Sequence, residues 1–322
     1  MPGPALPAPR SPLPVVIDTD PGIDDMLALL LALASPELEV RGIAVSYGNT
    51  IVEHAHRNAV EILRRAGKRV TLAMSARKPL RRALAVALET HGGSGLGHAE
   101  LPPAGVVLDY VRPLDRLLAE QPEPVTLLTL GPLTGLALAL RRDAALVHAK
   151  VARHLAMAGN LNAPGNTTRY SEFNAWCDPE ALDAVLRAEL PTELVGLDVT
   201  RQMVLSGEEI ARLGQVNTPL ARWVHDALRF YLDFHRRYDD LDGCVINDVL
   251  PVAELVRPDV LSFEPLRVAV GLEDGEQRGR TKVHPEGARV AVATGVRVEP
   301  VRALLFERVL PWLAGSLIEG AT

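Results

Sequence analysis

Four aspartates fall within the eight residues of the segment Asp18-Thr19-Asp20-Pro21-Gly22-Ile23-Asp24-Asp25. A short β-branched apolar run precedes this segment and a longer apolar run follows it. The two runs predict a buried strand, a turn at Pro21-Gly22 and a buried helix. Side chains alternate along a strand, so Asp18 and Asp20 share one face. Crowded and partly buried carboxylates must be protonated, paired or bound to a metal ion.

The same segment contains no Cys or His, so the ligands that it offers are oxygens. Oxygen ligands favour hard cations such as Ca²⁺ or Mg²⁺ over Zn²⁺. An Asp at the start of a helix is often only a cap, which could account for Asp24 or Asp25 alone. A cap does not account for four carboxylates at once, and the cluster therefore predicts a cation site.

This segment resembles the amino-terminal signature of the inosine/uridine-preferring nucleoside hydrolases. The resemblance covers nearly the whole chain after residue 13, through Gly48-Asn49, His91-Gly92, Gly131-Pro132-Leu133-Thr134, Glu172-Phe173-Asn174 and Asp248. It implies an enzyme that uses Ca²⁺ to hydrolyse the N-glycosidic bond of ribonucleosides, giving ribose and free base. It also implies an open, mostly parallel α/β sheet with a Rossmann-like core, and a homodimer or homotetramer.

The resemblance also implies which residues hold the metal. Asp20 matches the residue that ligates Ca²⁺ and removes a proton from the metal-bound water, so it is the expected catalytic base. Asp18 matches a supporting position. The implied ligands are Asp20, Asp25, Asp248 and a backbone carbonyl just before Gly131, which we place at Leu130.

A second set of residues is implied to surround the ribose. Asp24 matches the residue that holds the 2′-hydroxyl, and Glu172 and Asn174 resemble binders of the 3′- and 5′-hydroxyls. Taken alone, the pair Gly48-Asn49 is more typical of a turn than of a binding site. Met157, taken alone, is more typical of a core residue. The full implied set is Asp24, Asn49, Met157, Asn166, Glu172, Phe173 and Asn174.

The chemistry explains these residue types. Glycosyl hydrolysis passes through an oxocarbenium-like state, whose positive charge carboxylates stabilise. A metal ion lowers the pKa of its bound water and so supplies hydroxide near neutral pH. The leaving base must in turn be protonated or otherwise stabilised.

The chain departs from the family pattern at the leaving-group acid. Many members have a His directly before the last metal-binding Asp, where this chain has Asn247, which cannot donate a titrating proton. Another acid could serve, the base could be activated by hydrogen bonds or stacking alone, or the natural substrate could differ. The candidate acids or base contacts are His91, Tyr231, His235 and Tyr238.

Among these candidates His91 is favoured for base contact because it occupies the family's His-Gly position. A lone His such as His235 is more often a surface residue. The chain also has Gly135 where the family usually has an Asn after Leu-Thr. We expect that change to be a matter of helix packing.

Two other functions remain open at this stage. A Mg²⁺-dependent phosphatase with an Asp nucleophile shares the Asp-x-Asp after a strand, but its later Lys and Ser/Thr elements are not evident. A nucleoside- or ribose-binding protein could retain the metal and have weak or altered hydrolase activity, and Asn247 keeps this alternative open.

Composition narrows the class of protein. The 322 residues are 48% hydrophobic, enough for a sizeable core, and the net charge of −6 argues against nucleic acid as a partner. The two cysteines, Cys177 and Cys244, lie far apart, which predicts buried thiols and fits a reducing cytoplasm. No uninterrupted apolar stretch has membrane-spanning length, so we expect no membrane partner.

The order of the predicted elements gives the fold class. Residues 1–14 carry six prolines and no apolar h-region, which predicts a flexible tail before a nucleoside hydrolase domain over residues 15–322. Strand-like and helix-like runs alternate in that domain, which indicates a single α/β domain with a largely parallel sheet. Expected strands are 15–20, 40–45, 70–74, 125–130, 154–158 and 193–197, and 263–299 is expected to form a hairpin region. Expected helices are 26–34, 52–66, 108–120, 133–142, 178–188, 220–238 and 302–314.

The predicted loops point to where a ligand binds. Residues 90–105 form a long expected loop, which in a compact domain is often functional. Ligands of open α/β sheets bind at the carboxyl ends of the strands. The polar residues that gather at those ends are Asp20, Asn49, Asn160 or Asn166, and Asp198, together with Leu130-Gly131.

Overall fold

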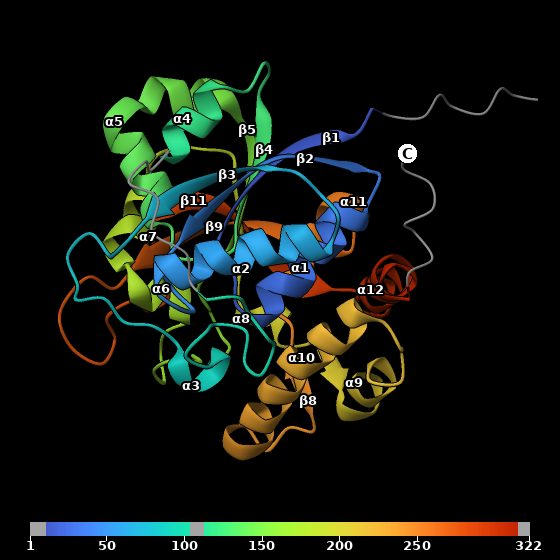
Figure 1. Ribbon diagram of the computed structural model, residues 1–322. Helices are drawn as coiled ribbons and strands as arrows, with labels where there is room; N and C mark the ends of the chain where they lie inside the picture. Colours follow the sequence, from blue (N-terminus) through green and yellow to red (C-terminus); the bar gives the residue numbers. More distant parts are fainter. Residues whose placement is uncertain (1–10, 104–112, 315–322) are drawn as a thin grey trace, which may run out of the picture.

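A nine-stranded sheet lies at the centre of the protein, with helices on both faces (Figure 1). The computed structural model describes residues 11–103 and 113–314. From β11 to β3 every pair of neighbouring strands is parallel, whereas β9 is antiparallel to both β11 and β10. The order across the sheet is β10 (Thr281–Val283), β9 (Leu261–Val270), β11 (Ala288–Val296), β6 (Thr192–Val195), β5 (Val151–Met157), β4 (Val125–Thr129), β1 (Leu13–Thr19), β2 (Leu38–Ser46) and β3 (Thr71–Ala76). The predicted single α/β domain with a mostly parallel sheet is confirmed.

The central strands of this sheet are buried on both faces, because their side chains alternate between two separate cores. Val15 and Ile17 of β1 belong to one core, and Val16 to the other. The helices over the first core are α1 (Ile23–Ala34), α2 (Val52–Arg65), α11 (Val249–Val256) and α12 (Val298–Leu313). Those over the second core are α4 (Leu114–Ala119), α5 (Thr134–Lys150) and α7 (Pro179–Leu186).

The remaining elements lie near one end of the sheet. Helix α10 (Pro219–Tyr238) contacts α3 (Leu88–His91) and α9 (Gly207–Leu213), and these elements are grouped at the bottom of Figure 1. Strands β7 (Val204–Ser206) and β8 (Gly243–Val245) form a small antiparallel pair. Two short helices, α6 (Phe173–Cys177) and α8 (Leu197–Thr200), lie in the loops that follow β5 and β6.

The carboxyl ends of β1 and β4 lie at the point of the sheet where the strand order reverses. From β1 the chain continues to β2 and β3 on one side, and then returns to β4, β5 and β6 on the other side. Ligands of open α/β sheets bind where the strand order reverses in this way. Asp20 follows β1 and Leu130 follows β4, so both lie at this point.

Several boundaries differ from the sequence-based prediction. Helix α1 begins at Ile23, three residues before the predicted start, because Asp24 and Asp25 occupy its first turn, where carboxylates interact favourably with the helix dipole. Helix α5 is interrupted at a non-helical Asp143, directly after the predicted end at residue 142, and a second helical stretch continues to Lys150. The expected hairpin region forms three strands instead of two. The sequence did not predict α3, α6, α8, α9, β7, β8 or α11, all of which have eight or fewer residues.

Some predictions concern residues outside the described ranges. Part of the expected helix 108–120 lies there, and α4 is its described portion. Most of the expected tail also lies there, and β1 begins inside it at Leu13. Both cysteines are buried and free, as predicted. Among the described residues no helix is long and apolar enough to cross a membrane.

Candidate active site

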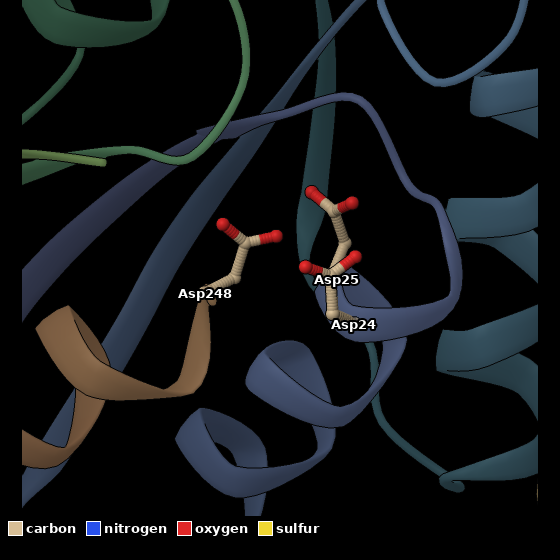
Figure 2. A group of neighbouring side chains, drawn as sticks. All are labelled: Asp24, Asp25 and Asp248. Atoms are coloured by element: carbon tan, nitrogen blue, oxygen red, sulfur yellow. The ribbon is translucent and has the colours of Figure 1, made fainter. Parts of the chain in front are cut away.

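Three buried carboxylates from opposite ends of the chain meet at the end of the sheet. Carboxylate oxygens of Asp24, Asp25 and Asp248 all lie within 4.8 Å of one another. Figure 2 shows Asp248, at the start of α11, facing Asp24 and Asp25 in the first turn of α1. Helices α1 and α11 pack against each other, and this contact brings together residues that lie far apart in the sequence.

Asp20 lies beside this group and is enclosed by backbone. Its Oδ2 accepts a 2.7 Å hydrogen bond from the N–H of Asn49. A Cβ atom at Gly48 would lie 1.9 Å from Asp20 Oδ2, and one at Gly131 would lie 2.5 Å from Oδ1. Glycine at both positions therefore lets the chain ends after β2 and β4 close around the carboxylate. Asp20 Oδ1 is buried and has no hydrogen-bond partner among the described residues.

Asp25 is held in one orientation by its neighbours. Its Oδ1 accepts a 2.5 Å hydrogen bond from the Thr19 hydroxyl. Its Oδ2 accepts bonds of 2.9 Å from the Gly22 N–H and 2.7 Å from Asn49 Nδ2. Asn49 thus contacts both Asp20 and Asp25, and it fixes the distance between the two carboxylates.

The four neighbouring carboxylates, Asp20, Asp24, Asp25 and Asp248, form a buried negative site that a cation would stabilise. Burial, and then repulsion from Asp25, raises the pKa of Asp20 well above its usual range. Burial, and then repulsion from Asp24, does the same to the pKa of Asp248. Within the described ranges none of the four forms an ion pair with a basic side chain. The oxygen-only donor set and the unpartnered Asp20 Oδ1 fit a hard cation such as Ca²⁺ or Mg²⁺.

The Glu172-Phe173-Asn174 motif is packed against the end of β4. Asn174 Nδ2 donates to the carbonyls of Leu130 at 2.7 Å and Met157 at 3.0 Å. Glu172 caps α6, because its carboxylate accepts from the N–H groups of Asn174 and Ala175. A third bond, of 2.8 Å, comes from the N–H of Gly159. Glu172 is therefore both a pocket residue and a local structural anchor.

A pocket opens above the carboxylates, and most of the predicted site residues line it. Asp20 and Asp25 do not line the pocket, since they are 1% and 0% exposed and lie beneath it. The predicted residues that do line it are Asp24, Asn49, His91, Leu130, Met157, Asn166, Glu172, Phe173, Asn174, Tyr231, His235, Asn247 and Asp248.

The sequence profile of the inosine-uridine preferring nucleoside hydrolases matches residues 15–303. The chain belongs to this family. A pyrimidine-specific ribonucleoside hydrolase, RihA of Klebsiella pneumoniae (strain 342), is 37% identical over 276 residues, or 84% of this chain and 88% of RihA. A plant nucleoside hydrolase, the PpNRh1 enzyme, has a TM-score of 0.85 at 31% identity, covering 92% of this chain and 99% of that chain. A purine-preferring ribonucleoside hydrolase from Gardnerella vaginalis has a TM-score of 0.86 at 28% identity, covering 94% and 99%.

The resemblance inferred from the sequence is thereby confirmed. This nucleoside hydrolase is an N-glycosyl hydrolase of ribonucleosides from a metal-dependent family. Its buried aspartate cluster could bind the metal.

One wall of the nucleoside hydrolase pocket is aromatic and carries the candidate acids. The rings of His91 and Tyr231 lie 5.3 Å apart, and those of Tyr231 and His235 lie 4.4 Å apart. His235 is only 4% exposed, so the expectation of a surface residue is wrong. Its Nδ1 donates to the Tyr231 carbonyl at 2.9 Å, and its Nε2 lies 3.4 Å from the Val245 N–H. Tyr238 is 54% exposed and does not line the pocket.

Asn247 occupies the position next to the acid cluster. Its Nδ2 lies 3.4 Å from Asp24 Oδ2, and its Oδ1 accepts a 2.8 Å hydrogen bond from the Thr200 hydroxyl. Asn247 therefore contacts a carboxylate and a hydroxyl, and it lines the pocket as an amide.

Sequence reasoning missed several pocket residues. Phe234 could have been found, because it lies one helical turn from Tyr231 on α10. Arg201, at the end of α8, carries no signal in the sequence, since α8 was not predicted. The missed lining residues are Ala87, Thr90, Thr167, Leu197, Arg201, Phe234, Asp239 and Val245.

Two polar residues expected at the strand ends hold loops and do not line the pocket. Asp198 accepts from the backbone N–H groups of residues 161–163. Asn160 Nδ2 donates to the carbonyls of Ala163 and Tyr170. Both stabilise the segment that carries Asn166.

Gly135 lies where helix α5 packs closely on strand β3, which fits the expectation of a helix-packing role. A Cβ atom at this position would lie 1.5 Å from Ser75 Oγ and 2.7 Å from Asp18 Oδ2. Glycine is therefore required because α5 packs directly against the Ser75 and Asp18 side chains, which form a polar contact next to the acid cluster.

Proposed function

We propose that this protein hydrolyses ribonucleosides with Ca²⁺ held by Asp20, Asp25, Asp248 and the carbonyl of Leu130. The observation that carries this proposal is the buried, unpartnered Asp20 Oδ1 among four carboxylates with no ion-pair partner in the described ranges. When bound, Ca²⁺ would lower the pKa of a water molecule and so supply a nucleophile near neutral pH.

Asp20 is the residue best placed to take up the proton of the attacking water. Its Oδ1 is left for the cation, and its Oδ2 accepts one hydrogen bond from the Asn49 N–H and keeps a second lone pair for the proton. Gly48 and Gly131 hold the carboxylate between two strand ends, so the base is oriented before the substrate arrives.

Sugar recognition falls to the residues that line the pocket above the cluster. Asp24 would accept from the ribose 2′-hydroxyl, while Glu172, Asn174 and Asn166 would bind the 3′- and 5′-hydroxyls. The Nδ2 of Asn174 is committed to the Leu130 and Met157 carbonyls, so its Oδ1 is the atom that faces a ligand. The surrounding carboxylates would stabilise the positive charge that develops on the ribose ring.

For the leaving base we propose His91 as a hydrogen-bond donor and Tyr231 and Phe234 as the surface that it packs on. All three line the pocket. We also infer a preference for pyrimidine nucleosides. Its support is the 37% identity to a relative described as pyrimidine-specific, against 28% to the structure described as purine-preferring.

The organisation of the protein is inferred in the same way. We propose that residues 15–322 act as one hydrolase domain after a short tail. From the family resemblance we infer a homodimer or homotetramer, and from the two free cysteines a cytoplasmic location. Sedimentation of the full chain would measure the subunit number.

A nucleoside panel assayed with and without chelator tests the proposed function. Wild-type protein should release ribose from uridine or cytidine, should lose this activity with chelator, and should regain it with Ca²⁺. Release of phosphate from ribose phosphates without base release would support the phosphatase. Saturable nucleoside binding with no turnover in the presence of Ca²⁺ would support the binding protein.

A further inference from the structure

Ser75 is an extra residue in strand β3, directly beside the site. In the pairing of β2 with β3, Val45 lies opposite Met74 and Ser46 lies opposite Ala76, which leaves Ser75 without a partner in β2. Such a bulge changes the direction of a side chain, and bulges are common next to active sites. The Ser75 hydroxyl donates a 2.8 Å hydrogen bond to Asp18 Oδ2 of β1, two strands away across the sheet.

Two small residues open the path for this contact. Ala44 of β2 lies opposite Asp18, so no large side chain separates β3 from β1 at this level. Gly135 of α5 leaves the space above: a Cβ atom there would lie 1.5 Å from Ser75 Oγ and 2.9 Å from Ser75 Cβ. A side chain at residue 135 and one at residue 75 cannot both be accommodated.

Asp18 connects this contact to the metal-binding residues. Its backbone carbonyl accepts a 2.8 Å hydrogen bond from the N–H of Leu130, whose own carbonyl is a proposed ligand. Asp20, the proposed base, lies two residues further on. Asp18 Oδ1 is buried and has no partner among the described residues, so the Ser75 hydroxyl is the one hydrogen bond that the structure gives this side chain within those ranges.

We propose that Ser75, placed by the β3 bulge and given room by Gly135, is a positioning residue that holds Asp18 and thereby sets the ends of β1 and β4 for Ca²⁺ binding. This inference rests on the proposed function, because it assigns Ser75 to the same metal centre. Partners of this kind, one step away from the ligands, typically change metal affinity or activity by about 10–100-fold.

Calorimetric Ca²⁺ titration of the full-length Ser75→Ala variant tests the proposal. The dissociation constant for Ca²⁺ should rise by about 10-fold. At saturating Ca²⁺ the KM for the nucleoside should stay near the wild-type value, because Ser75 does not line the pocket. The matched control is Ser35→Ala, which removes another buried hydroxyl, bonded to the Leu31 carbonyl at 2.7 Å. It should leave Ca²⁺ affinity unchanged.

An exchange of the two residues separates positioning from simple loss of packing. Gly135→Ser alone should lower the unfolding temperature of the metal-free protein, because its Cβ meets Ser75. The double variant Ser75→Gly with Gly135→Ser should recover both the unfolding temperature and the Ca²⁺ affinity, since one hydroxyl again lies beside Asp18. Gly135→Ser that unfolds like wild type, or Ser75→Ala that binds Ca²⁺ like wild type, would overturn the proposal.

The proposed function and this inference fail in different ways. If the wild type binds no Ca²⁺, the proposed metal is wrong, and Ser75 is then judged by whether Ser75→Ala lowers kcat at unchanged KM. A second outcome is that the wild type binds Ca²⁺ and turns over nucleosides while Ser75→Ala keeps the wild-type dissociation constant for Ca²⁺ and the wild-type kcat. In that case the proposed function stands and the positioning role is rejected.

Discussion

Nδ1 of His91 accepts a 3.1 Å hydrogen bond from the backbone N–H of Ile23, the first residue of α1. The proton of the neutral ring therefore resides on Nε2. Burial, with repulsion from His235 as the second cause, lowers the pKa of His91 to about 3. His91 is thus a fixed hydrogen-bond donor in the pocket wall, and it cannot act as a titrating acid near neutral pH.

With Asn247 in place of the usual His, turnover should depend strongly on the leaving group. General acid catalysis typically contributes about 10²–10⁴-fold. A nitrophenyl riboside, which needs no acid, should therefore be cleaved far faster than uridine or inosine. Asn247→His should narrow the gap, provided that the ring reaches the base. Equal rates for the activated and natural substrates, unchanged by this substitution, would mean that an unidentified group supplies the proton. In the same assay, His91→Ala should slow uridine cleavage without changing the shape of the pH profile between about pH 5 and 8. Tyr231→Phe keeps the ring on which the base packs, so it should change the rate little unless its hydroxyl is the acid.

Ca²⁺ binding should release protons and weaken as the pH falls. Burial raises the pKa of Asp20, Asp25 and Asp248 in the metal-free protein, so these groups hold protons at pH values where exposed carboxylates do not. The metal binds only the deprotonated form. Calorimetric titration in two buffers of different ionisation enthalpy measures the protons released. A Ca²⁺ affinity that stays constant as the pH falls from about 8 to 5 would contradict the assigned ligand set.

Asp20→Asn should lose several orders of magnitude in turnover while the fold survives. The amide oxygen can still accept from the Asn49 N–H, but the proposed base and one charged metal ligand are lost. Turnover, circular dichroism and Ca²⁺ affinity should be measured together. Asp274→Asn, whose side chain is fully exposed, is the control and should keep full activity. Near-native turnover of Asp20→Asn with bound metal would show that another residue is the base.

Asn174→Ala and Glu172→Gln should each weaken binding of a ribose analogue, by about 1.5–3 kcal/mol if a hydrogen bond to a charged group is lost. Both variants should also lose stability, since Asn174→Ala removes the Nδ2 bonds to the Leu130 and Met157 carbonyls. Glu172→Gln replaces one carboxylate oxygen with an N–H₂ group, which then faces either the N–H of Asn174 or those of Gly159 and Ala175, so it should also lower the unfolding temperature. Inhibition constants for the analogue give the binding effect. Unchanged constants in both variants would rule out the sugar-binding role.

His154 should make the protein sensitive to acid. It is buried in β5 between the hydroxyls of Thr129 and Thr192, and burial lowers its pKa to about 3. The unfolded chain binds this proton at the ordinary pKa of about 6.5, so the contribution is fully present above that pH. It is lost at up to about 1.4 kcal/mol per pH unit as the pH falls toward 3.

The matched variant for this test is His154→Gln, which keeps polar atoms and removes the titrating ring. The difference between the unfolding free energies of wild type and variant, measured by urea denaturation from about pH 7 to 5, isolates the effect from that of the buried carboxylates. A constant difference across this range would exclude His154 as the cause.

The sequence by itself determined the parallel sheet and most of the pocket. The apolar runs around Asp18–Asp25 and the long periodic helices are local signals, because burial of a strand or a helix face depends on neighbouring residues in the chain. Thirteen of the predicted residues line the pocket. Some of them, such as Asn49 and Leu130, follow strands, and the carboxyl ends of parallel strands meet at one edge. The family motifs supplied their proposed roles.

Only the tertiary structure decided what lies between distant segments. In the folded chain Asp248 lies beside Asp24 and Asp25. His235 is buried, and Arg201 and Phe234 line the pocket. The tertiary structure also showed that Gly135 is required by Ser75, a residue 60 positions earlier that a bulge aims across the sheet. Contacts of this kind depend on register and on packed volume, which are properties of the assembled sheet and helices, and no local pattern of residues records them.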